Sequence, residues 1–194
     1  MVLSLGAGQD FLTSLVTWKV RIVSRKITIE WNEGWFGARA VGVMLDGKNR
    51  VLLSRLEDED VWVLPGGAIS LHETSKEAVK REFIEETKFE IEVHRLLWIL
   101  ENYWVFKGKT AHDIGFHFLV SPKEAKGVWE QDEFVGQEEL HTPDRSWVLI
   151  FKWFDISKLN ELNLKPSIFI ELLKDIPEHP MHVVHNALGE KIHS

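Results

Sequence analysis

Residues 66–89, GGAISLHETSKEAVKREFIEETKF, gather three glutamates near the end of one predicted helix. Glu82, Glu85 and Glu86 lie where the helix dipole favours cations and disfavours carboxylates. Glu82 and Glu86 are also four residues apart, so their charges repel by a few tenths of a kcal/mol, about 0.2–0.5. On a helical wheel of about 100° per residue, all three fall in one sector. Because carboxylates on one face can bind a hard divalent cation, we expect a bound cation to offset both costs.

The same stretch predicts where this helix begins and ends. Thr74 and Glu77 are three residues apart and form a capping box, so the helix is expected to begin near Ser75. It is expected to end near Thr87. A glutamate-rich stretch of this kind is more often a solvated helix face than a binding site, so the glutamates alone decide nothing.

The surrounding residues fill a longer pattern. It reads Gly, five residues, Glu, seven residues, Arg-Glu, an apolar residue, any residue and Glu-Glu, and it is filled by Gly67, Glu73, Arg81, Glu82, Glu85 and Glu86. Six such matches at fixed spacing arise by chance with a probability on the order of one in ten million per start position. The pattern is the Nudix box. The chain resembles the Nudix hydrolase family over about residues 38–155.

The resemblance implies both a fold and a reaction. The implied fold is α/β (α+β), an α/β/α sandwich around a mixed β-sheet. The implied activity is that of a pyrophosphohydrolase, which cleaves the diphosphate linkage of a nucleoside diphosphate joined to another moiety. Magnesium or manganese assists the attack of water on phosphorus, and the partner is a nucleotide-derived small molecule.

Two other hypotheses stay open. A Nudix-fold module could sense a nucleotide without cleaving it, but such a module is expected to have lost box carboxylates, and all are present here. Alternatively, the match is accidental and the chain is a generic α/β domain. That hypothesis predicts three glutamates that face bulk solvent instead of a cleft.

Site residues are carried over from the family position by position. The implied metal ligands are Glu82, Glu85, Glu86 and the carbonyl group of Gly66. Arg81 is expected to pair with Glu73 and to orient the metal-binding carboxylates. The general base is Glu85 or Glu86, or an acid from the polar segment 121–146. The candidates there are Glu133, Glu138 and Glu139, each of which is more simply explained as a solvated acid.

One position departs from the family pattern. The last glycine of the box is Lys88 here. Glycine at this place typically forms a left-handed C-cap, and another residue in that conformation costs roughly 1 kcal/mol. The departure leaves every carboxylate in place, so we expect activity to be kept.

Substrate contacts outside the box are less specific. Arg39 and Arg55 flank apolar strands and could hold phosphate as bidentate donors, or form salt bridges at a rim. Three tryptophans could stack on a base, although packing is favoured for each of them: Trp62, Trp98 and Trp104.

Histidines and one aspartate complete the candidates. His112 and Asp113 lie on a predicted strand and could contact substrate. His182 and His185 are three residues apart, a spacing compatible with a metal pair, but no further ligand lies nearby in the sequence.

Hydrophobic patterning predicts strands, one helix, more strands and further helices, in that order. The predicted strands are 20–31, 38–45, 50–56, 61–64, 90–104, 112–120 and 147–154. The strands 38–45 and 50–56 are expected to form a hairpin around the turn DGKN. Residues 121–146 are expected to be a long loop. Asp155 is expected to cap a short helix through Leu162, and a last helix, 167–176, follows Pro166.

Composition narrows the class of protein. The 194 residues carry a net charge of −7, which argues against binding to duplex nucleic acid. The chain contains no cysteine, which fits a cytoplasmic protein and excludes thiolate chemistry. No apolar run is long enough to span a membrane. We expect residues 1–18 to form a loosely ordered leader and residues 19–194 to form a single domain. Apolar strands in the N-terminal extension are compatible with a homodimer.

Overall fold

The computed structural model describes residues 26–188 except 33, 107, 125–126 and 140–145. The predicted leader therefore lies outside the described residues. The elements in chain order are β1 (Thr28–Trp31), β2 (Gly34–Met44), β3 (Arg50–Leu56), β4 (Gly66–Ala68), α1 (Ser75–Thr87), β5 (Ile91–Phe106), β6 (Lys109–Pro122), η1 (Val128–Glu130), β7 (Glu133–Glu139), β8 (Ser146–Asp155), η2 (Ile156–Glu161), α2 (Phe169–Leu172) and β9 (Met181–Asn186).

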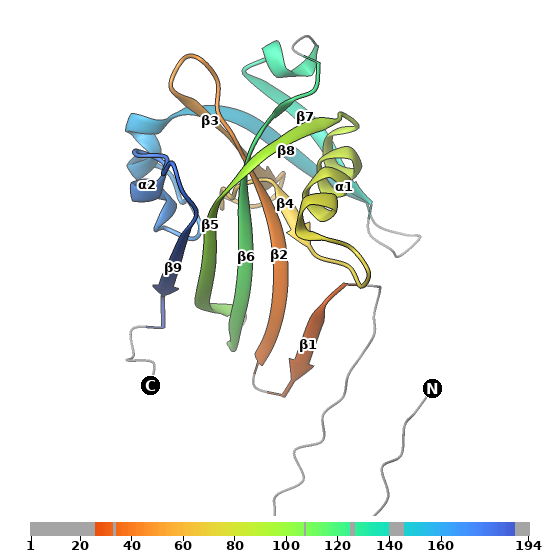
Figure 1. Ribbon diagram of the computed structural model, residues 1–194, viewed down its shortest axis with the longest axis vertical. Helices are drawn as coiled ribbons and strands as arrows, with labels where there is room; N and C mark the ends of the chain where they lie inside the picture. Colours follow the sequence, from red (N-terminus) through yellow and green to blue (C-terminus); the bar gives the residue numbers. More distant parts are fainter. Residues whose placement is uncertain (1–25, 33, 107, 125–126, 140–145, 189–194) are drawn as a thin grey trace, which may run out of the picture.

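Two β-sheets lie between α1 on one side and α2 on the other (Figure 1). The larger sheet has the order β1-β2-β6-β5-β9, with β4 paired to β2. It is mixed, because β2 pairs with β6 and β5 pairs with β9 in parallel while its other pairs are antiparallel. The smaller sheet, β3-β8-β7, is antiparallel. The predicted α+β class with a mixed sheet is confirmed.

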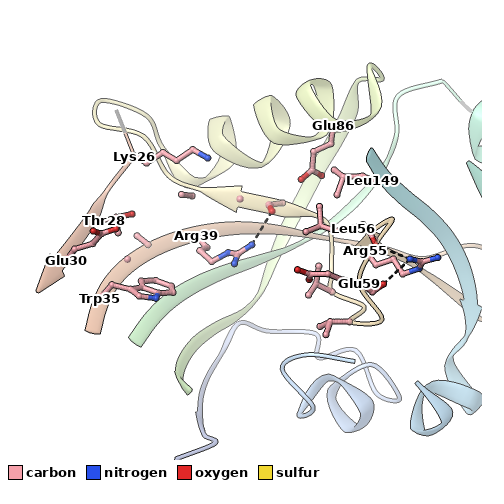
Figure 2. Close-up of a pocket in the computed structure, with 18 residues that line it drawn as sticks. Lys26, Thr28, Glu30, Trp35, Arg39, Arg55, Leu56, Glu59, Glu86 and Leu149 are labelled. Carbon is pink, nitrogen blue, oxygen red and sulfur yellow. Dashed lines mark hydrogen bonds between the residues drawn. The ribbon is translucent and has the colours of Figure 1, made fainter. Parts of the chain in front are cut away.

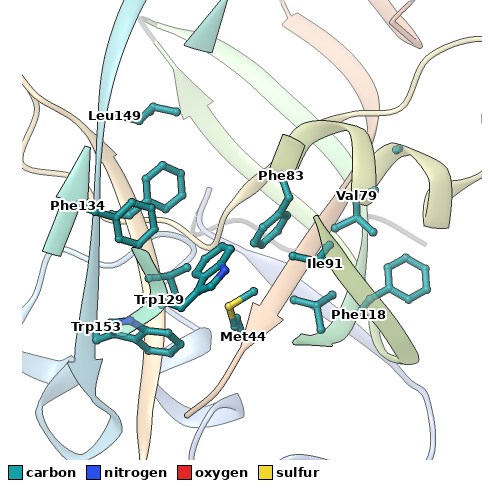
Figure 3. Close-up of a cluster of buried hydrophobic side chains, with 14 of the residues drawn as sticks. Met44, Val79, Phe83, Ile91, Phe118, Trp129, Phe134, Leu149 and Trp153 are labelled. Atoms are coloured by element: carbon teal, nitrogen blue, oxygen red, sulfur yellow. The ribbon is translucent and has the colours of Figure 1, made fainter. Parts of the chain in front are cut away.

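The core is divided between the two faces of β2. Ala40 and Met44 belong to a cluster that Phe83 of α1 completes (Figure 3). Val41 and Val43 alternate with them and belong to a second cluster on the other face, beneath η2 and α2. Because β2 is buried on both faces, it is a rigid support for the residues at its amino-terminal end.

The predicted hairpin is only partly correct. The turn forms, since Asp46 N donates to Arg50 O at 3.0 Å and Leu45 bridges Val51. The strands then separate into different sheets, where β2 pairs with β6 and β3 pairs with β8. Each strand is buried on both faces, which a two-stranded hairpin alone would not achieve, and the pairings with β6 and β8 place each strand in a larger packed sheet.

Three further predictions need correction. Residues 61–64 form isolated bridges instead of a strand. The predicted loop 121–146 contains η1 and strand β7, which pairs with β8 and contacts α1. The predicted last helix, 167–176, is reduced to the four residues of α2, and the tail after it forms β9, which extends the larger sheet beside β5. The predicted strand 20–31 is described only from residue 26 onward, where β1 covers Thr28–Trp31, and its earlier part lies outside the described residues. The predicted strands 90–104, 112–120 and 147–154 and the short helix capped by Asp155 are confirmed.

Candidate active site

Helix α1 begins and ends as its sequence predicts. The Thr74 side chain accepts from Glu77 N, and the Glu77 carboxylate accepts from Thr74 N at 2.8 Å, which completes the capping box. Lys88 takes the left-handed conformation, with φ 64° and ψ 14°, and its N–H donates to Ile84 O at 2.9 Å. The chain therefore keeps the C-cap geometry without the glycine. The Lys88 ammonium donates to the carbonyl oxygen of Glu85 at 3.1 Å and places a cation at the helix end.

Arg81 joins three glutamates into one network. Its Nε and Nη2 donate to the two carboxylate oxygens of Glu73 at 2.7 and 3.1 Å. Its Nη1 donates to Glu82 at 2.7 Å and to Glu85 at 2.9 Å. Its Nη2 also donates to the Ala68 carbonyl at 3.0 Å, which ties α1 to strand β4. One guanidinium thus fixes the carboxylates relative to the strand beside them.

The Arg81 network shifts the pKa values of the neighbouring carboxylates in different directions. Hydrogen bonds from Arg81 hold the pKa of Glu73 below its usual range, although partial burial opposes them. Burial raises the pKa of Glu82, and the charge and hydrogen bond of Arg81 counteract only part of that effect. The carboxylates raise the pKa of Arg81, which stays a cation. The box glutamates therefore differ in environment even though they share one helix.

The glutamates do not face bulk solvent as a group. Glu82 is 3% exposed and Glu86 is 7% exposed, whereas Glu85 has an exposed side chain. Strand β4 lies so close to Glu82 that a Cβ added to Gly67 would be 2.4 Å from the carboxylate. Glycine leaves room here for the carboxylate, which would have to shift if position 67 carried a side chain. The buried glutamates contradict the solvent-facing arrangement that the generic-domain hypothesis predicts.

A cleft of about 500 Å³ opens beside β4 and β2. Glu86 reaches it from α1, and Arg39 reaches it from β2, where Nη2 donates to the Gly66 carbonyl at 3.3 Å (Figure 2). Other lining residues include Lys26, Thr28, Glu30, Trp35, Gly37, Arg55, Leu56, Glu59 and Leu149. The predicted ligands Gly66 and Glu86 and the predicted phosphate contact Arg39 therefore border one cavity.

Arg55 lies at the same cleft but is held by its own loop. Its Nη1 donates to the carbonyl oxygens of Leu56, Glu57 and Glu59 at 2.6–2.9 Å. Its guanidinium also lies 5.2 Å from the ring centroid of Trp62. Arg55 thus orders the acidic loop at the rim, and Arg39 is the better placed of the two for phosphate.

The chemical type of the donor atoms is suited to a divalent cation. Glu82, Glu85, Glu86 and the Gly66 carbonyl offer hard oxygen ligands, which Mg²⁺ and Mn²⁺ prefer. Among the described residues, no three His, Asp or Glu side chains already converge as a metal-binding group. Since Arg81 holds Glu82 and Glu85, a cation bound by the box would have to compete with that guanidinium for their oxygens.

The later acids and the histidines have other surroundings. Glu133 is exposed and pairs with Lys152 at 3.0 Å, and the side chains of Glu138 and Glu139 lie outside the described residues. His182 pairs with Glu101, and His185 contacts Asn102. The two histidines are an odd number of residues apart on β9, so they project to opposite faces and do not form a metal pair.

The tryptophans divide as follows. Trp98 is fully buried and Trp62 is 8% exposed, so both pack in the core as favoured from sequence. Trp104 is half-buried and contacts Trp35 edge to face, with ring centroids 5.8 Å apart. Trp35 lines the cleft and was missed by the sequence analysis. The sequence around Trp35 gives little indication of this role, because only the pairing of β2 with β6 and β1 shows which face of β2 meets the cleft.

Comparisons with known proteins concern the family and the fold of this chain. A family model described as NUDIX domain matches residues 36–172. A MutT-like protein from Streptomyces ambofaciens is 39% identical over 61 residues, which are 31% of this chain and 40% of that protein. The match thus spans less than half the length of this relative.

Solved structures resemble the fold at low identity. A UDP-X diphosphatase has a TM-score of 0.52 at 20% identity, over 76% of this chain and 66% of that one. A mutator MutT protein from Bacillus halodurans has a TM-score of 0.50 at 23% identity, over 81% of this chain and 95% of that one. At these identities the likeness concerns the fold alone. Over the described part of the chain, none of the helices has the length and apolar character needed to cross a membrane.

Proposed function

Since the chain belongs to the Nudix hydrolase family, we propose that it is a metal-dependent pyrophosphohydrolase that cleaves the diphosphate linkage of a nucleoside diphosphate joined to another moiety. One observation supports this proposal above the others. Arg81 ties Glu73, Glu82 and Glu85 together next to a cleft that Glu86 and Arg39 line. Acidic groups held this way beside an arginine suit a polyanionic substrate that arrives with a cation.

Each of these residues has a distinct role in the proposed reaction. Arg39 binds a phosphate oxygen at the edge of β4, where its guanidinium already donates to the Gly66 carbonyl. Glu82, Glu86 and Glu85 hold Mg²⁺ or Mn²⁺, together with the Gly66 carbonyl. When bound there, such an ion would neutralise charge on the diphosphate and lower the pKa of a water molecule. Arg81 and Glu73 position the carboxylates, and Glu85 or Glu86 accepts the proton of the attacking water.

The alternative is a module that binds nucleotides without cleaving them. It would use the same cleft, so binding alone does not distinguish the two functions. The partner in both cases is a nucleotide-derived small molecule. A cytoplasmic location and a homodimer stay predictions from the sequence.

The deciding experiment is a hydrolysis assay with product analysis by chromatography. Purified protein is incubated with Mg²⁺ or Mn²⁺ and a panel of nucleoside triphosphates, dinucleoside polyphosphates, nucleotide sugars, ADP-ribose and NADH. Glu85→Gln and Glu86→Gln are compared with Glu171→Gln, a control at an exposed glutamate of α2. We expect cleavage of one class, loss of activity with a chelator, and a decrease of at least about 100-fold in the first two variants only.

Two results would count against the proposal. If both box variants cleave as well as the control, the box carboxylates do not take part in the reaction. If nothing in the panel is cleaved although nucleotides bind, the binding module becomes the better description.

A further inference from the structure

A row of side chains crosses the larger sheet from the cleft to β9. In register order across β1, β2, β6, β5 and β9, the row is Thr28, Gly37, Asp113, Asn102 and His185. Residues directly opposite each other on neighbouring strands project to the same face of the sheet. Thr28 and Gly37 line the cleft, so Asp113 lies on the cleft face, one strand beyond the lining residues.

Asp113 is a buried carboxylate with one oxygen still available. It is 6% exposed. Trp104 Nε1 and Asn102 Nδ2 donate to the same oxygen, Oδ2, at 2.9 and 3.2 Å. No hydrogen bond or ion pair from the described residues reaches Oδ1. Oδ1 is not one of the buried side-chain atoms without a partner in the described part of the chain, so it is reached by solvent and a ligand can donate a hydrogen bond to it.

The surroundings hold this carboxylate in one orientation. His185 Nδ1 donates to Asn102 Oδ1 at 2.9 Å, and this contact turns the Asn102 amide nitrogen toward Asp113. Burial, and then the charge of Lys165, lower the pKa of His185, which keeps its ring neutral with one donor and one acceptor. The acceptor, Nε2, lies 3.5 Å from the Ser167 hydroxyl. Strand β9 thus supports the orientation of Asp113 through Asn102.

An aromatic wall stands next to Asp113. Trp104, which donates to Asp113, meets Trp35 edge to face. A Cβ added to Gly37 would lie 3.2 Å from Trp35 Cζ3, so the indole lies along the backbone of Gly37, beside Asp113. Figure 2 shows Trp35 and Arg39 projecting from β2 among the residues that line the cleft.

The spacing from Arg39 matches the length of a nucleotide. Arg39 follows Gly37 by two residues, and Gly37 is the direct partner of Asp113. Strands about 4.8 Å apart with a rise of about 3.3 Å per residue place the Cα atoms of Arg39 and Asp113 about 8 Å apart. A phosphate held by Arg39 therefore brings the attached nucleoside to Trp35 and Asp113.

We propose that Asp113 selects the nucleoside part of the substrate: Oδ1 accepts a hydrogen bond from an N–H group of the base or from a sugar hydroxyl, while Trp35 packs against the base. The inference rests on the proposed function for its choice of ligand class. Because the available atom is an acceptor on a carboxylate, a nucleoside with a donor at this position is favoured over an analogue without one.

The experiment measures binding of nucleoside monophosphates by calorimetry without added metal. The panel is AMP, GMP, CMP and UMP, and the tightest binder is then compared with analogues that lack an N–H donor of its base or its 2′-hydroxyl, such as IMP and 2′-deoxy-GMP in the case of GMP. We expect one analogue to bind the wild-type protein about 10- to 100-fold more weakly. The analogue that loses affinity tells whether the base or the sugar donates.

Two variants assign this effect to Asp113. Asp113→Asn should bind the parent nucleotide about as weakly as the wild type binds the deficient analogue, so that discrimination disappears. Glu101→Gln is the matched control. Glu101 is an acid on β5 next to Asn102, the pairing partner of Asp113, and its side chain projects to the opposite face of the sheet, where it contacts His182. It should discriminate as the wild type does.

Three outcomes would overturn the inference: no monophosphate binds, every analogue binds the wild-type protein like its parent, or Asp113→Asn keeps the discrimination. The comparison of analogues uses the wild-type protein, so it stands even if Asp113→Asn does not fold. If the protein hydrolyses nothing but shows this pattern, the proposed function fails and the nucleoside site stands. If hydrolysis is found and the pattern is absent, only this inference fails.

Discussion

Replacement of Gly67 by alanine tests the close approach of β4 to the box glutamates. The new Cβ would lie 2.4 Å from Glu82 Cδ and Oε2, whereas an ordinary contact begins at 3.4 Å. The difference, 3.4 − 2.4 Å, requires a displacement of about 1.0 Å. The carboxylate is the end of a flexible side chain, but it is buried and bound to Arg81 at 2.7 Å, so it cannot move without a cost.

The expected loss is larger in activity than in stability. Overpacking lowers stability by about 1–3 kcal/mol. Alanine also lowers the conformational entropy of the unfolded chain relative to glycine, which stabilises the folded state by about 0.4–1 kcal/mol. The free energy of unfolding should therefore fall by about 1–2 kcal/mol, or about 2–8 °C in melting temperature. A displacement of about 1 Å in a catalytic carboxylate should lower kcat/KM by about 100-fold.

Gly47→Ala is the matched control. A Cβ at Gly47 meets no atom within 4 Å, so the same substitution should be neutral or slightly stabilising there. Urea unfolding and the hydrolysis assay are run on both variants. If Gly67→Ala is as stable and as active as Gly47→Ala, the position of Glu82 against β4 does not matter, and the steric argument is wrong.

Three further predictions follow from the same contacts. Arg81→Lys keeps the charge but loses the forked donors, so the free energy of unfolding should fall by about 2 kcal/mol and activity by about 100-fold, as measured by guanidinium unfolding and product release. Lys88→Val places a β-branched residue at φ 64° and should cost about 1–2 kcal/mol, whereas Lys88→Gly should be at least as stable as the wild type; equal unfolding midpoints for the two would contradict the strained C-cap. His117 is buried, and burial lowers its pKa to about 3, so the unfolded chain binds the extra proton between pH 6.5 and pH 3. Stability should accordingly fall on acidification through that window, by up to about 1.4 kcal/mol per pH unit, and this slope should be smaller in His117→Asn when unfolding is followed across the same pH range.

The parts of the site that sequence predicts are those fixed within one helix. The capping box and the end of α1 depend on spacing along a short stretch, and the geometry of a helix converts that spacing into position. The pairing of Arg81 with Glu73, which precedes the helix, was expected from the resemblance to the family. The structure adds a steric reason for the glycine of the pattern at position 67, where a Cβ would displace the Glu82 carboxylate.

The parts that sequence does not predict depend on pairing between distant strands. The runs 38–45 and 50–56 flank a good turn, and a hairpin is the local solution. Their central residues are buried without alternation, since Val43, Met44, Val51, Leu52 and Leu53 are all 0% exposed. Such continuous burial is typical of strands with both faces covered, and it does not reveal which strands pair along their edges.

The strands β7 and β9 were missed for a different reason. The segment of β7 is rich in charged residues, because one of its sides is exposed, as at Glu133 and Val135. The segment of β9 is short and follows a proline, and four of its first five residues, including His182 and His185, are histidine or valine without a clear alternation. In both cases tertiary pairing, and not intrinsic preference, forms the strand.

Local spacing along the sequence and pairing between distant strands both determine the cleft. The box supplies acidic groups and the arginine that holds them from residues close together in sequence, so family membership can be recognised from the chain alone. Asp113, Asn102 and His185 belong to the row of residues across the larger sheet and come from three different strands. They lie side by side only because of the order of the strands in the sheet. A register shift of one residue in β6 would turn Asp113 away from the cleft while leaving the box intact. Substrate choice in this protein is therefore expected to depend on sheet register, and a comparison of the box sequence alone cannot reveal it.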